Sequence, residues 1–495
     1  MSKLYVFGIG GTGARVIKSL AFLLASGVKL NSTIDTVVPV IIDPDQGNGD
    51  LTRTKQLLDL YIKINKKASD PNGFFSTSIK TLPELIDNRN HTITDKFKML
   101  ELDGTQNERF YQFIDKQNLD QQSNSLIELL FSEENLNAEM SVGFKGNPNI
   151  GSVVLNQFKN CAEYRLFLDS FKEGDSIFIV SSIFGGTGAA GFPLLLRNLR
   201  KEDSDLINSN LVANSNIGAL SMMPYFKVSP PAEGKVQTID SSSFLGKAKA
   251  ALSYYSTSIF QSKQLNAFYS IGEEASNFYE HNDGQIAQKN NAHFLELASA
   301  IAIVDFTNHL NGFNTQNNLA TETVFKEFGV KKPESRKLNF KSLGDETRNA
   351  IQVPLAKFFL MAKLNEFIKS KPGDFEKSPW FIALNEVYSN NGIYNLQIKE
   401  FERSYMDWLD EMDKNDISFE PFFKDVNYEQ LLNFIDGYNA KKPLWKFWSN
   451  EAHGDKFNEI LNKEFKGLKK TDDKGSDYLN LFHLASKKQI KSLIK

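Results

Sequence analysis

Two glycine-rich segments, each between an expected strand and an expected helix, constrain the fold of this chain most. Residues 4–7 form an apolar strand pattern that leads into Gly8-Ile9-Gly10-Gly11-Thr12-Gly13 and then into apolar residues at helical spacing. Much later, the strand pattern 176–181 leads into Gly185-Gly186-Thr187-Gly188 and a helix pattern over 192–199. Glycines let a backbone approach phosphate oxygens, and a helix N-terminus adds free amides. Both segments therefore predict phosphate binding.

The rest of the first half repeats this alternation of strands and helices. Strand patterns cover 37–42 and 217–222, and a helix pattern covers 51–64. Such alternation predicts an α/β fold with a doubly wound parallel sheet, which binds ligands at the carboxyl ends of its strands. We expect a nucleotide-binding domain over 1–310, with a polar insertion at about 66–140, and a mostly helical region over 311–495. The helix patterns of that second region are 350–369, 396–412, 428–438 and 457–468.

Composition narrows the class of protein. The formal net charge of −3 over 495 residues argues against a general nucleic-acid binder, which needs a basic surface. The single cysteine, Cys161, excludes an internal disulfide and fits a reducing cytoplasm. The sequence shows no secretory pattern and no apolar run that could span a bilayer. The six scattered histidines form no metal-ligand pattern with cysteine, so we expect no direct protein-built metal site.

The first glycine segment alone fits two kinds of nucleotide site. Gly8, Gly10 and Gly13 also match the dinucleotide pattern GxGxxG, which expects an acid about 20 residues further on. Asp43 stands 30 residues beyond Gly13, so this segment leaves both interpretations open. The second segment favours a triphosphate held from two sides, because a dinucleotide enzyme does not need a second strand–glycine loop–helix unit. No GxxxxGK[ST] pattern occurs, which excludes a P-loop.

Four segments together resemble the loops of the tubulin/FtsZ superfamily, in the order in which that family has them. Residues 8–13 are similar to its first phosphate loop, and 184–190 to its GGGTG[ST]G motif. Ile42-Asp43-Pro44-Asp45-Gln46 resembles its acid-bearing loop, and 143–151 reproduces the Gly-Asn-Pro-x-x-Gly of the FtsZ branch. Met223-Pro224-Tyr225-Phe226 is similar to the Lys-Pro-Phe that follows an FtsZ strand. The resemblance covers about residues 1–310 and suggests a divergent bacterial member.

The resemblance implies binding of GTP or GDP with Mg²⁺. The implied phosphate-binding residues are Gly10, Gly11, Thr12, Gly13, Gly146, Asn147, Pro148, Gly185, Gly186, Thr187 and Gly188. It also implies that Asp43 or Asp45 lies near Mg²⁺, with Asp45 acting through water. For the base it implies Glu273 after a strand, and Asn291 and Phe294 on a core helix at about 288–308. Two alternatives stay open: Glu273 as a solvent-facing acid, and Phe294 as a core residue.

Hydrolysis in the resembling family needs an acid that the next subunit inserts, and no clean copy of its NxDxxD pattern occurs here. Glu322 and Asp305 are the candidate catalytic acids after the core helix, with Glu322 preferred. Phe184 and Ala190 depart from the glycines of the family motif. We therefore expect either a self-assembling GTPase with head-to-tail contacts or a nucleotide-gated module with little turnover. The second would engage a protein partner through its insertion and helical region.

Overall fold

A computed structural model describes residues 2–45, 47–86, 95–99, 108–140, 144, 147–229, 241–273, 277–279, 288–313, 315–316, 319–327, 336–438 and 452–494. Its centre is a seven-stranded sheet in the order β11-β7-β5-β4-β1-β2-β3, and every neighbouring pair is parallel. The strands are β1 (Ser2–Ile9), β2 (Ile34–Ile42), β3 (Ser78–Ile79), β4 (Ser176–Ser182), β5 (Asn216–Met222), β7 (Ala267–Ile271) and β11 (Val324–Glu327). The four strands expected from sequence lie within β1, β2, β4 and β5, which confirms the α/β class.

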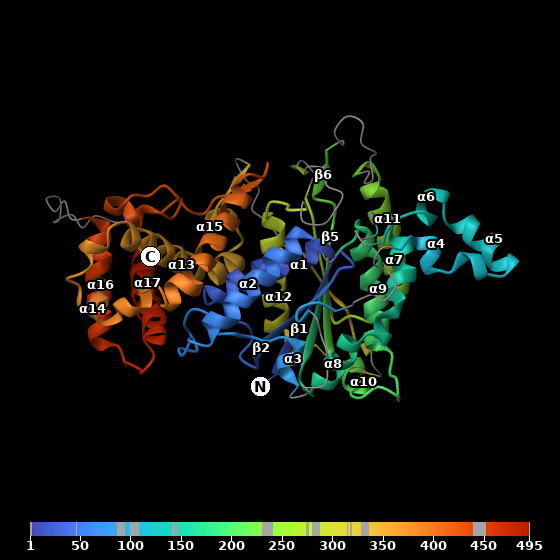
Figure 1. Cartoon of the computed structure of the whole chain (residues 1–495), viewed down its shortest axis with the longest axis horizontal. Helices are drawn as coiled ribbons and strands as arrows, with labels where there is room; N and C mark the ends of the chain where they lie inside the picture. Colours follow the sequence, from blue (N-terminus) through green and yellow to red (C-terminus); the bar gives the residue numbers. More distant parts are fainter. Residues whose placement is uncertain are drawn as a thin grey trace.

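Helices cover both faces of this sheet, because its strands are apolar on both sides and must be buried twice. One face carries α1 (Gly10–Ala25), α2 (Gly49–Asn65) and the core helix α12 (Phe294–Asn308). The other face carries α7 (Pro148–Val154), α8 (Ala162–Ser170), α9 (Gly186–Arg200), α10 (Ser209–Ala213) and α11 (Phe244–Tyr255), as Figure 1 shows. The sheet is therefore doubly wound, as expected.

Because all strands of the sheet run the same way, it has two chemically different edges. The loops that follow β1, β2, β4, β5 and β7 meet at what we call the carboxyl edge. The core helix runs away from that edge and ends at the opposite, amino edge. There Thr307 Oγ1 accepts a hydrogen bond from the Asn31 amide at 3.2 Å, shortly before β2 begins. The loops at the two edges therefore lie at opposite ends of the strands.

The region after the core helix is mostly helical, as expected. Its main helices are α13 (Asp345–Ser370), α14 (Pro379–Leu384), α15 (Lys399–Asp413), α16 (His453–Gly467) and α17 (Lys474–Leu493). The two-residue strands β12 (Lys337–Leu338) and β13 (Ser418–Phe419) pair with each other. The helix expected over 428–438 is instead a six-residue 3-10 helix, Tyr428–Asn433. Across the residues described, no helix is long and apolar enough to cross a membrane.

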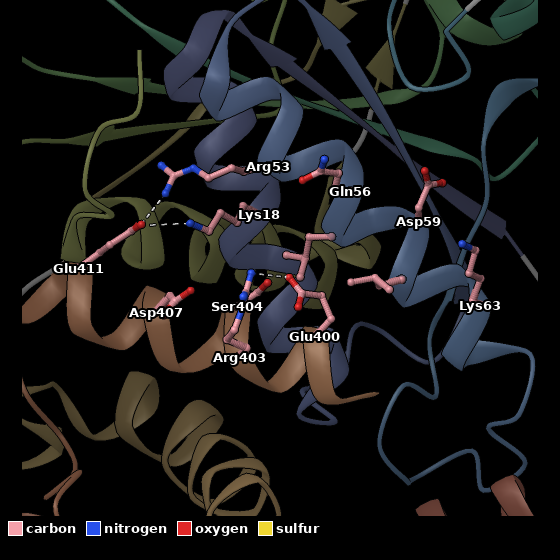
Figure 2. Close-up of a pocket in the computed structure, with 12 residues that line it drawn as sticks. Lys18, Arg53, Gln56, Asp59, Lys63, Glu400, Arg403, Ser404, Asp407 and Glu411 are labelled. Carbon is pink, nitrogen blue, oxygen red and sulfur yellow. Dashed lines mark hydrogen bonds and ion pairs between the residues drawn. The ribbon is translucent and has the colours of Figure 1, made fainter. Parts of the chain in front are cut away.

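This helical region packs against the sheet domain at several places, among them α1 and α2. The ring of Phe22 on α1 lies 5.0–5.6 Å from those of Phe401, Tyr405 and Trp408. Glu411 of α15 also forms ion pairs with Lys18 of α1, at 3.2 Å, and with Arg53 of α2 (Figure 2). Neighbouring side chains of α2 and α15 line a cavity of about 470 Å³. We call this contact the junction; it combines an apolar core with charges that are buried at Lys18 and partly buried at Glu411 and Arg53.

The segment expected as an insertion divides into two parts. In residues 66–86, β3 joins the sheet and both Phe74 and Phe75 are buried, so this part belongs to the body. Residues 108–140 instead project beside α7 as a set of short helices (Figure 1). They are α4 (Phe110–Phe113), a 3-10 turn Lys116–Asn118, α5 (Gln121–Leu130) and α6 (Glu133–Leu136). We call residues 108–140 the arm.

Candidate functional site

Two helices begin inside the two glycine segments, and their N-termini meet at the carboxyl edge. Helix α1 begins at Gly10 and α9 begins at Gly186. A Cβ atom placed on Gly10 would lie 3.7 Å from Thr187 Cβ and 3.9 Å from the Gly188 nitrogen. Free amides at two helix N-termini favour an anion between them. The structure therefore brings the first and second predicted phosphate loops together.

The glycines of these loops have different structural roles. A Cβ on Gly13 would lie 2.4 Å from the Gly8 carbonyl carbon, and one on Gly188 would lie 2.6 Å from the Ser182 oxygen. These two glycines are needed for close packing of each helix on the strand before it. Gly11 differs, because its Cβ would meet only the ends of Arg15 and Asn48 at 3.6 and 3.7 Å. Glycine at position 11 is therefore not required for packing, and it is partly exposed at the site.

The acid-bearing loop lies beside the first glycine loop. Ile9 pairs with Ile42 in the sheet, so Asp43 follows directly beside Gly10. Asp43 accepts a hydrogen bond from the Asp45 amide at 3.0 Å, and both carboxylates are buried. Burial raises the pKa of Asp43 to about 7, and the neighbouring Asp45 carboxylate adds to that rise. The two acids therefore lie where a phosphate-bound cation is expected, and Asp43 titrates near neutral pH.

The third predicted loop packs against the second. Asn147 and Pro148 open α7, with the Asn147 amide donating to the Phe144 carbonyl at 2.7 Å. Four residues into this short helix, a Cβ on Gly151 would lie 2.9 Å from the Gly186 oxygen. Glycine at 151 therefore lets α7 approach the first turn of α9. Gly146, one of the implied phosphate-binding residues, lies outside the described residues.

The predicted base-binding residues lie together at the start of the core helix. Glu273 Oε1 is 3.0 Å from Nε2 of His293, the residue that caps α12. Glu273 and Phe294 line one cavity of about 320 Å³. Phe294 is also buried, with its ring 5.0 Å from that of Phe419, and the Asn291 carbonyl accepts from the Tyr279 hydroxyl at 3.1 Å. The core helix itself begins at Phe294, after the 288 expected from sequence.

A buried ionic cluster behind the first glycine loop has no counterpart in the sequence-based site. Arg15 lies one turn into α1 and contacts Asp50 at 2.9 Å and Glu296 at 2.5 Å, with both carboxylates fully buried. It also donates to the Tyr225 hydroxyl at 2.8 Å. These contacts tie α1 to α2, to α12 and to the loop after β5. A charged residue inside the apolar pattern of α1 could have indicated a buried ion pair. Its partners are 35 to 281 positions away, so the sequence does not identify them.

Lys98 is a second residue that the sequence did not single out. The backbone around it pairs with Ile41 of β2, where Met99 donates to the Ile41 carbonyl at 2.8 Å. Side chains at positions 41, 43 and 98 consequently share one face of the sheet. Lys98 is 5% exposed, and its Nζ has no hydrogen-bond partner in the described part of the chain. Burial lowers the pKa of Lys98, and the nearby Asp43 carboxylate offsets only part of this lowering. A buried amine without a partner beside two acids is suited to an anionic ligand.

The two candidate catalytic acids lie near the amino edge. Asp305 is on α12, where it pairs with Lys326 at 2.7 Å and accepts from the Tyr269 hydroxyl at 2.6 Å. Glu322 is exposed and lies two residues before β11. The glycine loops lie at the carboxyl edge. Within one chain, Asp305 and Glu322 are therefore not next to these loops. Where the chain is described, no three His, Cys, Asp or Glu side chains gather as metal ligands.

Several solved structures share weak similarity with the chain. CetZ2 from Haloferax volcanii, a GTPgS-bound protofilament, is 13% identical with a TM-score of 0.28 over 62% of this chain and 59% of that one. CetZ1 from Haloferax volcanii, a GDP-bound monomer, is 12% identical with a TM-score of 0.28 over 61% and 58%. CetZ from Methanosaeta thermophila is 12% identical with a TM-score of 0.25 over 63% of this chain and 54% of that one.

In each case the chain spans less than two thirds of the matched structure. No protein-family model and no curated protein matches the sequence. Similarity at this level assigns no role to any residue, so the functional assignment rests on the geometry of the carboxyl edge.

Proposed function

We propose that the chain is a tubulin/FtsZ-like protein that binds a guanine nucleotide at the carboxyl edge of its sheet. The observation that carries the proposal is the meeting of two glycine-lined helix N-termini, Gly10–Thr12 of α1 and Gly186–Gly188 of α9, beside Asp43. Two such N-termini offer backbone amides and aligned dipoles to a di- or triphosphate. Asn147 and Pro148 complete the cradle on the side of α7.

Further residues around the cradle support a nucleotide with bound Mg²⁺. Buried carboxylates at Asp43 and Asp45 are the hard oxygen groups that Mg²⁺ accepts, directly or through its waters. Lys98 adds a positive charge next to them. The cavity that Glu273 and Phe294 line would take the base, with the carboxylate accepting from guanine N–H groups.

We further propose that the protein assembles head to tail in the cytoplasm as a slow GTPase. The glycine loops and the acids Glu322 and Asp305 lie at opposite edges of the sheet, so stacking the amino edge of one subunit on the carboxyl edge of another joins them. Glu322 is exposed at that edge and would position water at the γ-phosphate of the neighbour. Asp305 is already engaged by Lys326 and Tyr269 and would act only as support.

A second candidate is a nucleotide-gated binding module with little turnover. The junction favours it, because α1 carries the first glycine loop at its N-terminus and contacts the helical region with Lys18 and Phe22. A shift of α1 on nucleotide binding would therefore reach α15 directly. A protein partner of the helical region would then respond to the bound nucleotide.

Binding is tested with Gly11→Ala, because the structure separates its effects on fold and ligand. The new methyl group has room and replaces a glycine inside a helix, so folding stability should rise by about 0.5–1 kcal/mol. The same methyl stands on the first turn of α1, beside the amides proposed to hold the phosphates, so affinity for GTP and GDP should fall at least about tenfold, the equivalent of about 1.4 kcal/mol. Isothermal titration with GTP, GDP, ATP and NAD measures it.

The matched control is Gly246→Ala on α11, where a Cβ meets nothing within 4 Å. This control should gain similar stability and keep its affinity. Unchanged binding in Gly11→Ala, or tighter binding of ATP or NAD than of GTP in the wild type, would refute the proposed site.

Glu322→Ala separates the two candidate functions. If the shared active site is correct, this variant keeps nucleotide affinity and loses turnover, and wild-type turnover per subunit rises with protein concentration. Phosphate release measured over a dilution series checks both statements. A rate per subunit that is constant on dilution contradicts the shared site, and absence of turnover at every concentration favours the binding module.

A further inference from the structure

The arm is an ordered unit that stands apart from the body (Figure 1). The rings of Phe110 and Phe131 lie 4.9 Å apart, and the Phe110 amide donates to the Ala138 carbonyl at 3.0 Å. Asp120 caps α5 by accepting from the amides of Gln122 and Ser123. These contacts close the base of the arm and hold α5 at its outer end.

Helix α5 exposes an apolar stripe. Leu126, Leu129 and Leu130 are 54%, 82% and 57% exposed, and no residue of this ten-residue helix is buried. Their spacing of three and four positions places them on one side of the helix. A helix this short is marginal in water unless its apolar side is covered. Three exposed leucines on one projecting helix therefore indicate a contact surface.

A groove lies on the same side of the molecule as the arm. It lies between α7, α9 and α11 and has a volume of about 640 Å³. Its lining is mostly small or apolar, and Tyr254 at its rim is half exposed. The residues that line this groove are Asn147, Pro148, Asn149, Ser152, Ile183, Ala189, Ala190, Pro193, Leu194, Arg197, Lys247, Ala250, Ala251, Tyr254 and Tyr255. Such a groove suits an amphipathic helix with anchors three and four positions apart.

The arm and the groove carry opposite charge. Among residues 108–140 seven are acidic and two are basic, giving the arm a formal charge of −5. The acidic residues are Glu108, Asp115, Asp120, Glu128, Glu133, Glu134 and Glu139, and the basic ones are Arg109 and Lys116. The groove lining includes Arg197 and Lys247 and no acid. Complementary charge of this kind favours the arm as the occupant of the groove.

We infer that α5 of one copy of the chain docks in the groove of a second copy, and the reverse. The arm projects away from the body, so the groove that it meets is that of a neighbour (Figure 1). Its last residue, Met140, is eight positions before Pro148, where α7 begins to form one wall of the groove. Since arm and groove are neighbours on one side, a two-fold axis places both helices in both grooves at once.

This pairing goes beyond the proposed function and does not depend on it, although one end of the groove shares Asn147 and Pro148 with the proposed cradle. Head-to-tail stacking would join the two edges of the sheet, whereas the arm and groove lie over the face that carries α7, α9 and α11. The contact therefore forms sideways and needs no nucleotide. In an assembled protein it would pair neighbouring filaments.

Sedimentation of the nucleotide-free full chain at micromolar concentration provides the test. The wild type should sediment at twice the 55.9 kDa of one chain. Leu126→Asp/Leu129→Asp in the arm and Arg197→Glu/Lys247→Glu in the groove should each sediment as one chain. A mixture of the two variants should recover dimers, because one intact arm then meets one intact groove. Ile382→Asp, which charges an equally exposed residue on α14, should stay dimeric.

Cysteine cross-linking identifies the occupant. In a Cys161→Ser background, chains with Leu129→Cys and chains with Ala251→Cys should form a mixed disulfide dimer under mild oxidation. A wild type that sediments as one chain refutes the inference. So does a disulfide that closes within one chain when both cysteines are present, because the arm would then occupy its own groove. A dimer that survives both pairs of substitutions shows that another surface holds it.

Discussion

Glu411→Gln tests whether the junction between the two regions depends on buried charge. The change keeps the size of the side chain and removes the negative charge that faces Lys18 and Arg53. Lys18 is 6% exposed and would be left in the interior without a carboxylate. Breaking a fully buried pair costs about 3–5 kcal/mol. Because Arg53 is partly exposed and keeps Asp50 at 2.6 Å, we expect a loss of about 2–3 kcal/mol.

Urea unfolding followed by tryptophan fluorescence measures this loss. Trp408, one of four tryptophans, lies in the junction, where its Nε1 donates to Ser19 Oγ at 3.2 Å, so part of the emission change reports the separation of α15 from α1. The matched control is Glu400→Gln on the same helix. Glu400 is about half exposed and pairs with the exposed Arg403, so its loss should be under about 0.5 kcal/mol. In Lys18→Met/Glu411→Gln, part of the stability should return, because no buried charge is left unpaired.

The dependence on pH has a definite sign. Burial opposes ionisation of Glu411, but Lys18 and Arg53 outweigh it and hold its pKa below the usual range. The stabilisation is therefore present above the ordinary glutamate pKa of about 4.3 and disappears as the pH falls through the lower folded value. Wild type and Glu411→Gln should converge in acid. Equal losses for Glu411→Gln and Glu400→Gln at neutral pH would show that the aromatic contacts alone hold the junction.

Two further predictions concern the carboxyl edge. Lys98→Met should lower GTP affinity about tenfold in isothermal titration, since a charged hydrogen bond contributes about 1.5–3 kcal/mol, while Lys55→Met, which removes an amine already paired with Asp95, should have little effect; equal affinities in the two variants would contradict the role of Lys98. The folded pKa of Asp43 is raised to about 7, so its protonated form contributes stability that is fully present below the ordinary aspartate pKa of about 3.9 and is lost as the pH rises to about 7. Asp43→Asn should therefore show a flatter pH dependence of the urea midpoint between about pH 4.5 and 7; an unchanged slope would place the titration elsewhere.

The sequence predicted those parts of the fold that rest on local pattern. β1, β4 and β5 are runs of apolar residues, and their bounds differ from the expected ones by a few positions. Helix α9 begins at Gly186, six residues before the expected 192. The glycines of its first turn have low helix propensity, so the sequence pattern did not indicate that the helix starts there. Residues 428–438 have a helical pattern but form only a 3-10 helix, Tyr428–Asn433, which packs against α16.

The site was predictable only where it is continuous in sequence. The two glycine loops and the Asp43 loop meet as expected, because parallel strands bring their carboxyl ends to one edge. The pairing of Arg15 with Glu296 joins residues 281 positions apart, and no periodicity reports such a contact. Lys98 lies in a polar segment whose register against β2 is set by tertiary structure. The proposed site includes both kinds of residue, and local pattern predicts only the first.

Helix α1 has a consequence for how this protein can change over evolutionary time. All of its sixteen residues except Gly11 are buried, because the sheet, α2, α12 and α15 enclose it and a glycine loop begins it. A helix with no free side has almost no neutral positions, so a saturation mutagenesis scan should find 12–25 among the least tolerant stretches of the chain. Because the helix is enclosed, its residues are constrained by folding as well as by any role in binding. A descendant that did not bind the proposed nucleotide would still have to keep Leu20, Phe22 and Leu23 to remain folded, so the helix would persist in its sequence without the binding role.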